Sequence, residues 1–263
     1  MGKVETFELE IPFSQSPRTI WIYLPDSYET SRKKYDVLYM FDGHNLFFDE
    51  TATYGKCWGI KKFLDETNAD LIVVGQDCNH RGNRRLAEYC PYTPVETELE
   101  SIPKFRASGK TTAKWFAEVL KPETEKRYRV YKDRSHVGIA GSSMGGLMSE
   151  YMIAKYNDVY SKAACVSPST FFCYEDLKKE IRKTDFHKNT KVYIDQGSQE
   201  EHGKRLFIDA MTYMLKMNRL YSEKGVLTYP HLTPGGHHTE SDWEKVVPVF
   251  LSFLYPDVFE KKM

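Results

Sequence analysis

The sequence predicts an α/β fold, with a mostly parallel central sheet, an antiparallel hairpin at its N-terminal edge and helices on both faces. Short apolar runs alternate along the chain with longer segments whose apolar residues recur at helical spacing. The runs are nearly all apolar, which is typical of strands buried on both faces of a parallel sheet. Residues 4–12 instead alternate in polarity, which predicts an edge strand that pairs with the next strand in a hairpin.

The expected elements follow one another without a linker. After the opening strand, we expect strands over residues 19–24, 36–41, 70–75, 136–141, 162–167, 190–195 and 225–232. Helical periodicity predicts helices over residues 111–128, 145–156, 175–183, 203–221 and 240–255. Pro122 is expected to divide the first of these helices in two, because proline lacks an N–H and clashes with the preceding turn. The sequence contains no internal repeat or low-complexity tract, so we expect residues 1–263 to form one domain.

The composition excludes several classes of partner. Thirty-seven basic and thirty-seven acidic residues cancel, so there is no electrostatic reason to expect a nucleic acid or an anionic membrane as partner. No stretch approaches the roughly 18 apolar residues of a membrane span, and the N-terminus lacks an apolar leader. We therefore expect a cytoplasmic protein that acts on a small molecule, and the sequence leaves its oligomeric state open. Five cysteines without C-x-x-C spacing favour reduced thiols, and neither a metal nor another cofactor is expected.

A candidate nucleophile lies in the stretch Gly141-Ser142-Ser143-Met144-Gly145. It fits the pattern G-x-S-x-G in one register only, with Ser143 at its centre. An expected strand enters the motif and an expected helix leaves it, as a nucleophile elbow requires. Glycines at both ends would let the strand and the helix pass closely. The alternative is an ordinary glycine-rich turn.

A serine nucleophile needs a base and an acid, and both follow in suitable places. The expected strand over residues 190–195 leads into Asp195, Glu200 and Glu201, at the edge of the sheet where ligand sites of such folds lie. His237 and His238 follow the last expected strand in a glycine-rich loop. Paired histidines are also typical of metal sites, but the sequence shows neither an H-E-x-x-H motif nor another cluster of ligands.

Five segments, in this order along the chain, carry motifs of one known family. They are VLYMFDGHNLFF (37–48), RLAEYCP (85–91), AGSSMGGLMSEY (140–151), IDQGSQEE (194–201) and GGHHTESDW (235–243). Together they resemble the esterase D-like family of the α/β-hydrolase superfamily, which includes the feruloyl and acetylxylan esterases of carbohydrate esterase family 1 and siderophore esterases. The resemblance covers nearly the whole chain and implies an α/β-hydrolase fold.

The resemblance assigns roles to individual residues. It implies that Ser143 is the nucleophile and that His238 is the general base, because Trp243 follows His238 by five positions. Glu200 is then the acid of the triad, with Asp195 and Glu201 as the alternatives. Many relatives carry a small or polar residue in place of His237.

The same resemblance implies an oxyanion hole made by the backbone N–H groups of Met144 and His44. A helix N-terminus at Met144 agrees with this role, because its free amides point towards a developing negative charge. No cofactor is needed for such chemistry.

The implied activity is that of a serine carboxylesterase acting on small esters, with acetyl or feruloyl esters of carbohydrates as the expected substrates. Trp58, Tyr89 and Tyr92 are expected near the cleft, where aromatic rings would stack on a sugar or a phenolic acyl group, although core positions are equally open to them. Arg81, Arg84 and Arg85 would instead suit the carboxylate of a catecholate siderophore ester, although such charges more often face solvent on a loop. A siderophore esterase and a catalytically silent binding module of the same fold are the alternatives.

Overall fold

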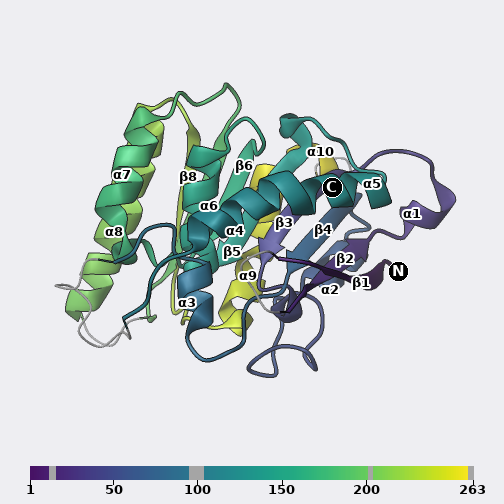
Figure 1. Cartoon of the computed structure of the whole chain (residues 1–263), viewed down its shortest axis with the longest axis horizontal. Helices are drawn as coiled ribbons and strands as arrows, with labels where there is room; N and C mark the ends of the chain where they lie inside the picture. Colours follow the sequence, from purple (N-terminus) through teal and green to yellow (C-terminus); the bar gives the residue numbers. More distant parts are fainter. Residues whose placement is uncertain (12–15, 95–103, 201–203, 260–263) are drawn as a thin grey trace.

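One eight-stranded sheet forms the centre of the computed structural model, which describes residues 1–11, 16–94, 104–200 and 204–259 (Figure 1). The strand order is β1-β2-β4-β3-β5-β6-β7-β8. β1 and β2 form the predicted antiparallel hairpin, β2 is also antiparallel to β4, and all further pairs are parallel. The strands are β1 (Lys3–Leu9), β2 (Arg18–Leu24), β3 (Asp36–Phe41), β4 (Leu71–Gln76), β5 (Val137–Ser142), β6 (Lys162–Val166), β7 (Lys191–Gly197) and β8 (Leu227–Thr233).

These strands confirm the predicted fold class, and the seven expected after the opening strand lie within two residues of their predicted bounds. β8 is less buried than the other parallel strands. It pairs only with β7 at the edge of the sheet, and Leu227 and Tyr229 are exposed, whereas the other parallel strands are buried.

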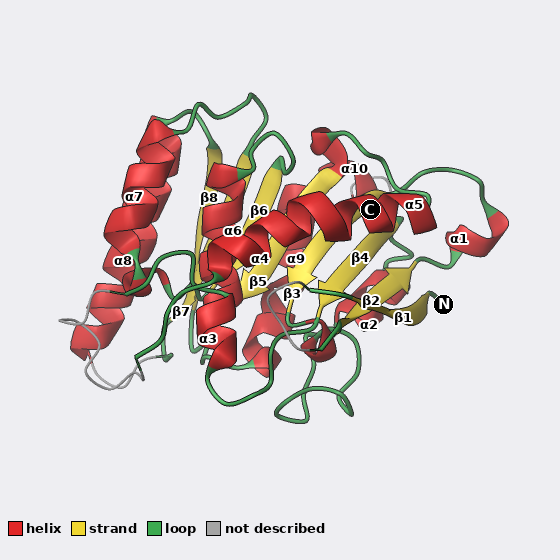
Figure 2. Ribbon diagram, in the orientation of Figure 1, coloured by secondary structure: helices red, strands yellow, loops and turns green. Residues whose placement is uncertain are grey.

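Helices cover both faces of the sheet (Figure 2). One core lies between the sheet and α4, α6, α7 and α8, and a second lies between the opposite face and α2, α9 and α10. Successive side chains of β3 show the alternation: Tyr39 and Phe41 belong to the first core, and Leu38 and Met40 to the second. The helices are α1 (Ser27–Thr30), α2 (Ile60–Glu66), α3 (Arg84–Glu88), α4 (Gly109–Trp115), α5 (Lys121–Arg127), α6 (Met144–Lys155), α7 (Tyr174–Lys183), α8 (Lys204–Glu223), α9 (Glu240–Leu254) and α10 (Pro256–Phe259).

The predicted break at Pro122 is wrong. The chain stays helical from α4 into α5, through a π-helical segment η2 (Phe116–Leu120) that ends just before the proline. In a π turn the hydrogen bonds span five residues and not four, and the helix is wider there. This leaves room for the proline ring at the start of α5, and the helix continues.

The strands β3 to β8 run in one direction, so their carboxyl ends meet at one edge of the sheet. The segments that follow them carry Ser143, Glu200 and His238 of the candidate site described below. None of the described helices is long and apolar enough to cross a membrane.

Candidate active site

Ser143 occupies a strained turn between β5 and α6. Its backbone has φ 56° and ψ −120°, a region that residues other than glycine rarely adopt. A Cβ added at Gly141 would lie 2.7 Å from the carbonyl carbon of Gly145, and one added at Gly145 would lie 2.9 Å from Phe41 Cβ. Only glycine fits at both positions, so the strand and the helix pass closely and present Ser143 at the tip of the turn.

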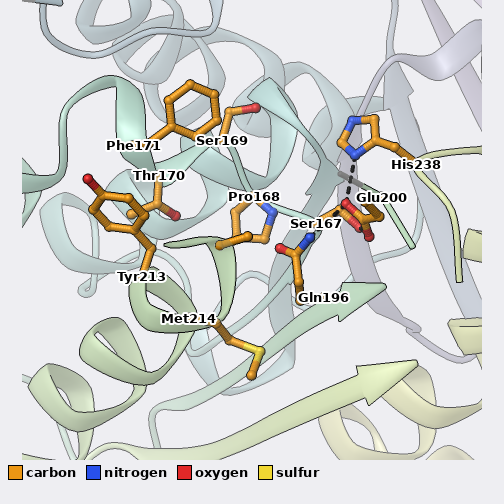
Figure 3. Close-up of a pocket in the computed structure, with 11 residues that line it drawn as sticks. Ser167, Pro168, Ser169, Thr170, Phe171, Gln196, Glu200, Tyr213, Met214 and His238 are labelled. Atoms are coloured by element: carbon orange, nitrogen blue, oxygen red, sulfur yellow. Dashed lines mark hydrogen bonds and ion pairs between the residues drawn. The ribbon is translucent and has the colours of Figure 1, made fainter. Parts of the chain in front are cut away.

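His238 and Glu200 lie side by side at the same edge of the sheet. His238 Nδ1 is 2.8 Å from Glu200 Oε2, and Figure 3 shows the ring and the carboxylate facing each other. The glutamate side chain is 3% exposed and the histidine 40%. A carboxylate only accepts hydrogen bonds, so this contact assigns a proton to Nδ1 and leaves Nε2 to accept a proton from a nucleophile.

The carboxylate of Glu200 is fixed by three further donors. Oε1 accepts hydrogen bonds from Ser167 Oγ at 2.5 Å and from the Gly197 amide at 2.6 Å. Oε2 also accepts one from Gln196 Nε2 at 2.9 Å. With all four hydrogen bonds made, the carboxylate cannot turn away from the histidine.

Trp243 supports this arrangement from α9. Its Nε1 donates a hydrogen bond to Ser167 Oγ at 3.0 Å, and its ring lies edge-on to the His238 ring with 4.9 Å between centroids. The tryptophan therefore holds both the base and, through Ser167, the acid. The sequence interpretation missed Ser167, whose only signal is its position directly after β6.

Asp195 and the other histidine do not join this pair. Asp195 is buried and contacts His231 Nδ1 at 2.7 Å and Thr233 Oγ1 at 2.8 Å. Burial raises the pKa of Asp195, and these contacts only partly offset the effect. Glu201 lies outside the described residues. His237 turns towards α9, where its Nδ1 is 3.2 Å from Asp242 Oδ2.

Ser143 and His238 line one cavity of about 700 Å³. The Ser143 hydroxyl lies 3.3 Å from Ser169 Oγ, and within the described part of the chain no hydrogen bond joins it to His238. Hydrogen bonds between a nucleophile and its base often tighten only when substrate is bound.

Two backbone amides face no acceptor at this edge. Met144 is the first residue of α6, and His44 lies in the turn η1 (Gly43–Asn45) after β3. Neither amide donates a hydrogen bond to another described residue. The turn begins at Asp42, whose left-handed φ of 56° is held by a bidentate ion pair with Arg85, at 2.7 and 2.6 Å.

Three of the four pocket residues expected from the sequence lie elsewhere. Trp58 is 2% exposed and packs on Trp243, and Tyr89 is fully buried with its hydroxyl donated to Gln76. Tyr92 donates its hydroxyl to Glu180 and is not part of the cavity lining. These aromatic side chains fill the core beneath the loops, because burying them there removes large apolar areas from water. Arg85 does line the cavity, but its guanidinium is paired with Asp42.

Comparisons with known proteins show the family and the fold of this chain. A family model described as "Putative esterase" matches residues 13–252. The uncharacterized protein YbbA of Bacillus subtilis (strain 168) is 25% identical over 203 residues, which cover 77% of this chain and 75% of YbbA. An IroE-like serine hydrolase from Shewanella oneidensis superposes with a TM-score of 0.74 at 18% identity, over 98% of this chain and 80% of the other. A ferulic acid esterase gives a TM-score of 0.68 at 19% identity, over 96% and 97% of the two chains. The predicted α/β-hydrolase fold is thereby confirmed.

Proposed function

Because the chain belongs to the "Putative esterase" family, we propose that it hydrolyses small carboxylic esters with Ser143, His238 and Glu200 as a catalytic triad. The observation that carries this proposal is the contact of His238 Nδ1 with Glu200 at the edge of the cavity that Ser143 also lines. The elbow presents the serine, and the carboxylate holds the imidazole in the tautomer that accepts a proton at Nε2.

The proposed reaction has two steps. Ser143 Oγ attacks the ester carbonyl and His238 takes its proton, which it then gives to the leaving alcohol. Water attacks the acyl-enzyme in the same way and releases the acid. The amides of Met144 and His44 would stabilise each tetrahedral oxyanion, and a single donor of this kind lowers a barrier by about 3 kcal/mol.

The finer proposal is that the ester joins a short acyl group to a carbohydrate. A second hollow of about 40 Å³ lies beside His238 and Glu200, and Pro168, Phe171 and Met214 contribute to its wall (Figure 3). This space suits an acetyl group better than a feruloyl ring. The large cavity is walled mainly by hydroxyl, amide and charged side chains, which suits a polyhydroxylated alcohol.

A catecholate siderophore ester is less well supported. The sequence interpretation offered Arg81, Arg84 and Arg85 to bind its carboxylate. The guanidinium of Arg85 is already paired with Asp42, and neither Arg81 nor Arg84 is among the described residues that line the cavity.

A hydrolysis panel tests these proposals. We expect wild-type protein to hydrolyse p-nitrophenyl acetate and acetylated xylo-oligosaccharides with higher kcat/KM than methyl ferulate or a catecholate ester. Ser143→Ala should abolish turnover, whereas Ser142→Ala, the matched control one position earlier in the motif, should retain it. Activity that survives Ser143→Ala would refute the nucleophile. If the wild type is inert on the whole panel and Ser143 also fails to react with a fluorophosphonate, the silent binding module is favoured instead.

A further inference from the structure

Four side chains with metal-ligand chemistry converge at the wall of the large cavity. His44 follows β3, and Asp77, Cys78 and His80 follow the neighbouring parallel strand β4. One potential ligand atom from each lies within 4.8 Å of all the others, and the two histidines and the cysteine line the cavity. Sequence spacing did not predict this cluster, because one member comes from a different loop.

The buried ring of His44 supplies one of the four candidate ligand atoms. Its Nδ1 lies 2.5 Å from Asp77 Oδ1 without the alignment of a hydrogen bond. At this distance the two atoms form a close ion pair. A tetrahedral Zn²⁺ with bonds of about 2.0–2.1 Å to each would hold them about 3.3 Å apart, so metal binding has to separate them. The other ring nitrogen, Nε2, is 2.9 Å from Thr53 Oγ1, and metal-bound histidines usually use their second nitrogen in this way.

His80 closes the cluster on the side of the cavity. Its side chain is 54% exposed, and its Nε2 lies 3.0 Å from the same oxygen of Asp77. Its Nδ1 is 3.9 Å from Cys78 Sγ, and its ring stands edge-on to that of His44 with 4.5 Å between centroids. An ion could therefore enter from the cavity and displace only one exposed ring.

We propose that His44, Asp77, Cys78 and His80 bind a divalent transition-metal cation, with Zn²⁺ as the best match. Two imidazole nitrogens, one thiolate and one carboxylate form a mixed ligand set that suits Zn²⁺ and excludes Mg²⁺ and Ca²⁺, which prefer oxygen. Cys78 would release its proton to solvent on binding, and the thiolate and carboxylate together would balance the two positive charges. The charge of nearby Arg85 is already balanced by Asp42.

Cobalt is the probe for the test, because Co²⁺ takes the place of Zn²⁺ and absorbs light. Purified full-length protein is treated with EDTA, exchanged into buffer and titrated with Co²⁺. We expect one equivalent to bind, with d–d bands in the visible and a thiolate-to-cobalt band in the near ultraviolet. Zn²⁺ should then displace the cobalt and bleach both.

Variants assign the ligands. Cys78→Ser should remove the near-ultraviolet band, and His80→Ala, at a half-exposed position that tolerates truncation, should weaken binding by about 10–100-fold or more. Matched controls are Cys57→Ser, a buried thiol outside the cavity, and His136→Ala, which removes another histidine in contact with an aspartate. Both should bind as the wild type does.

Several results would overturn the proposal. Binding of no cobalt by a folded wild type, or equal binding by all four variants, would mean that the cluster is only a hydrogen-bonded network. Loss of binding in His237→Ala with retention in His80→Ala would place the ion at the paired histidines instead. None of these readouts depends on ester hydrolysis, so the result is separate from that of the substrate panel.

Discussion

Replacing Glu200 with glutamine tests whether this residue controls the protonation of His238. In the structure each carboxylate oxygen accepts two hydrogen bonds, one pair from Ser167 and Gly197 and the other from Gln196 and His238. A glutamine must place its NH₂ group against one of these pairs. The Gly197 amide cannot rotate or lose its proton, whereas His238 can move its proton from Nδ1 to Nε2. The NH₂ group should therefore face the histidine.

The size of the effect follows from that orientation. With its proton on Nε2, His238 cannot accept the proton of Ser143, and only the oxyanion donors and substrate binding remain. A serine–histidine pair held in the wrong tautomer loses about 10⁴-fold in kcat, or about 5.4 kcal/mol of barrier. We expect this fall with little change in KM, measured by p-nitrophenyl acetate hydrolysis, with thermal unfolding to show that the variant is folded.

Asp195→Asn is the matched control. Asp195 lies in β7, just before the turn that carries Glu200. It is also buried and also contacts a histidine, but that histidine is His231. The kcat of Asp195→Asn should stay within about threefold of the wild type, because Asp195 touches neither His238 nor Ser143. A large loss in Asp195→Asn, or an equal loss in both variants, would refute Glu200 as the acid of the triad.

Three further predictions concern neighbouring residues. Ser167→Ala removes one hydrogen bond from Glu200, so kcat should fall about tenfold at constant KM. Ser167→Thr should restore part of the lost kcat. A change in KM alone would contradict this positioning role. Arg85→Met leaves the buried Asp42 without a counter-ion, so urea denaturation should show a free energy of unfolding lower by about 3–5 kcal/mol. The double variant Arg85→Met with Asp42→Asn should recover part of this loss. An unchanged free energy of unfolding would mean that the ion pair is dispensable. Burial raises the pKa of Glu150 to about 8, only partly opposed by a hydrogen bond from Thr170, so its protonated form stabilises the fold below pH 4.5 and that stabilisation is lost as the pH rises towards 8. Glu150→Gln should therefore gain stability relative to the wild type between pH 5 and 8, by up to about 1.4 kcal/mol per pH unit, and parallel pH profiles would contradict this.

The sequence predicted the sheet well because strand burial leaves a local signal. Runs such as residues 36–41 and 136–141 are apolar throughout, and the structure places them as central strands. The strained turn at Ser143 was also predictable, because the need for glycine at positions 141 and 145 is steric and local. Helix α3, by contrast, has only five residues and lies in a polar segment, so its periodicity is too short to detect.

The pocket was less predictable, because the burial of an aromatic side chain depends on what packs above it. Tyr89 and Trp58 carry the same chemistry whether they line a cavity or fill a core, and only the fold decides between the two. Asp195 and Glu200 likewise lie five residues apart near the end of β7, where the sequence alone makes them equivalent candidate acids. Their roles separate only because the loop after β8 brings His238 to Glu200, while His231 lies within β8 beside Asp195.

The stretch RLAEYCP (85–91) contacts the scaffold around the loop that carries the proposed oxyanion donor His44. Arg85 clamps Asp42 at the start of η1, Tyr89 donates its hydroxyl to Gln76 at the end of β4, and the buried Glu88 forms an ion pair with Arg18 of β2. Arg85 and Tyr89 thus hold the backbone at Asp42, two residues before His44, whose amide is one of the two proposed oxyanion donors. With these side chains committed to the scaffold, discrimination between substrates is left to the polar groups that line the cavity. For this reason the alcohol part of the ester should affect kcat/KM more than the acyl part, once the acyl group is short enough for the hollow beside His238.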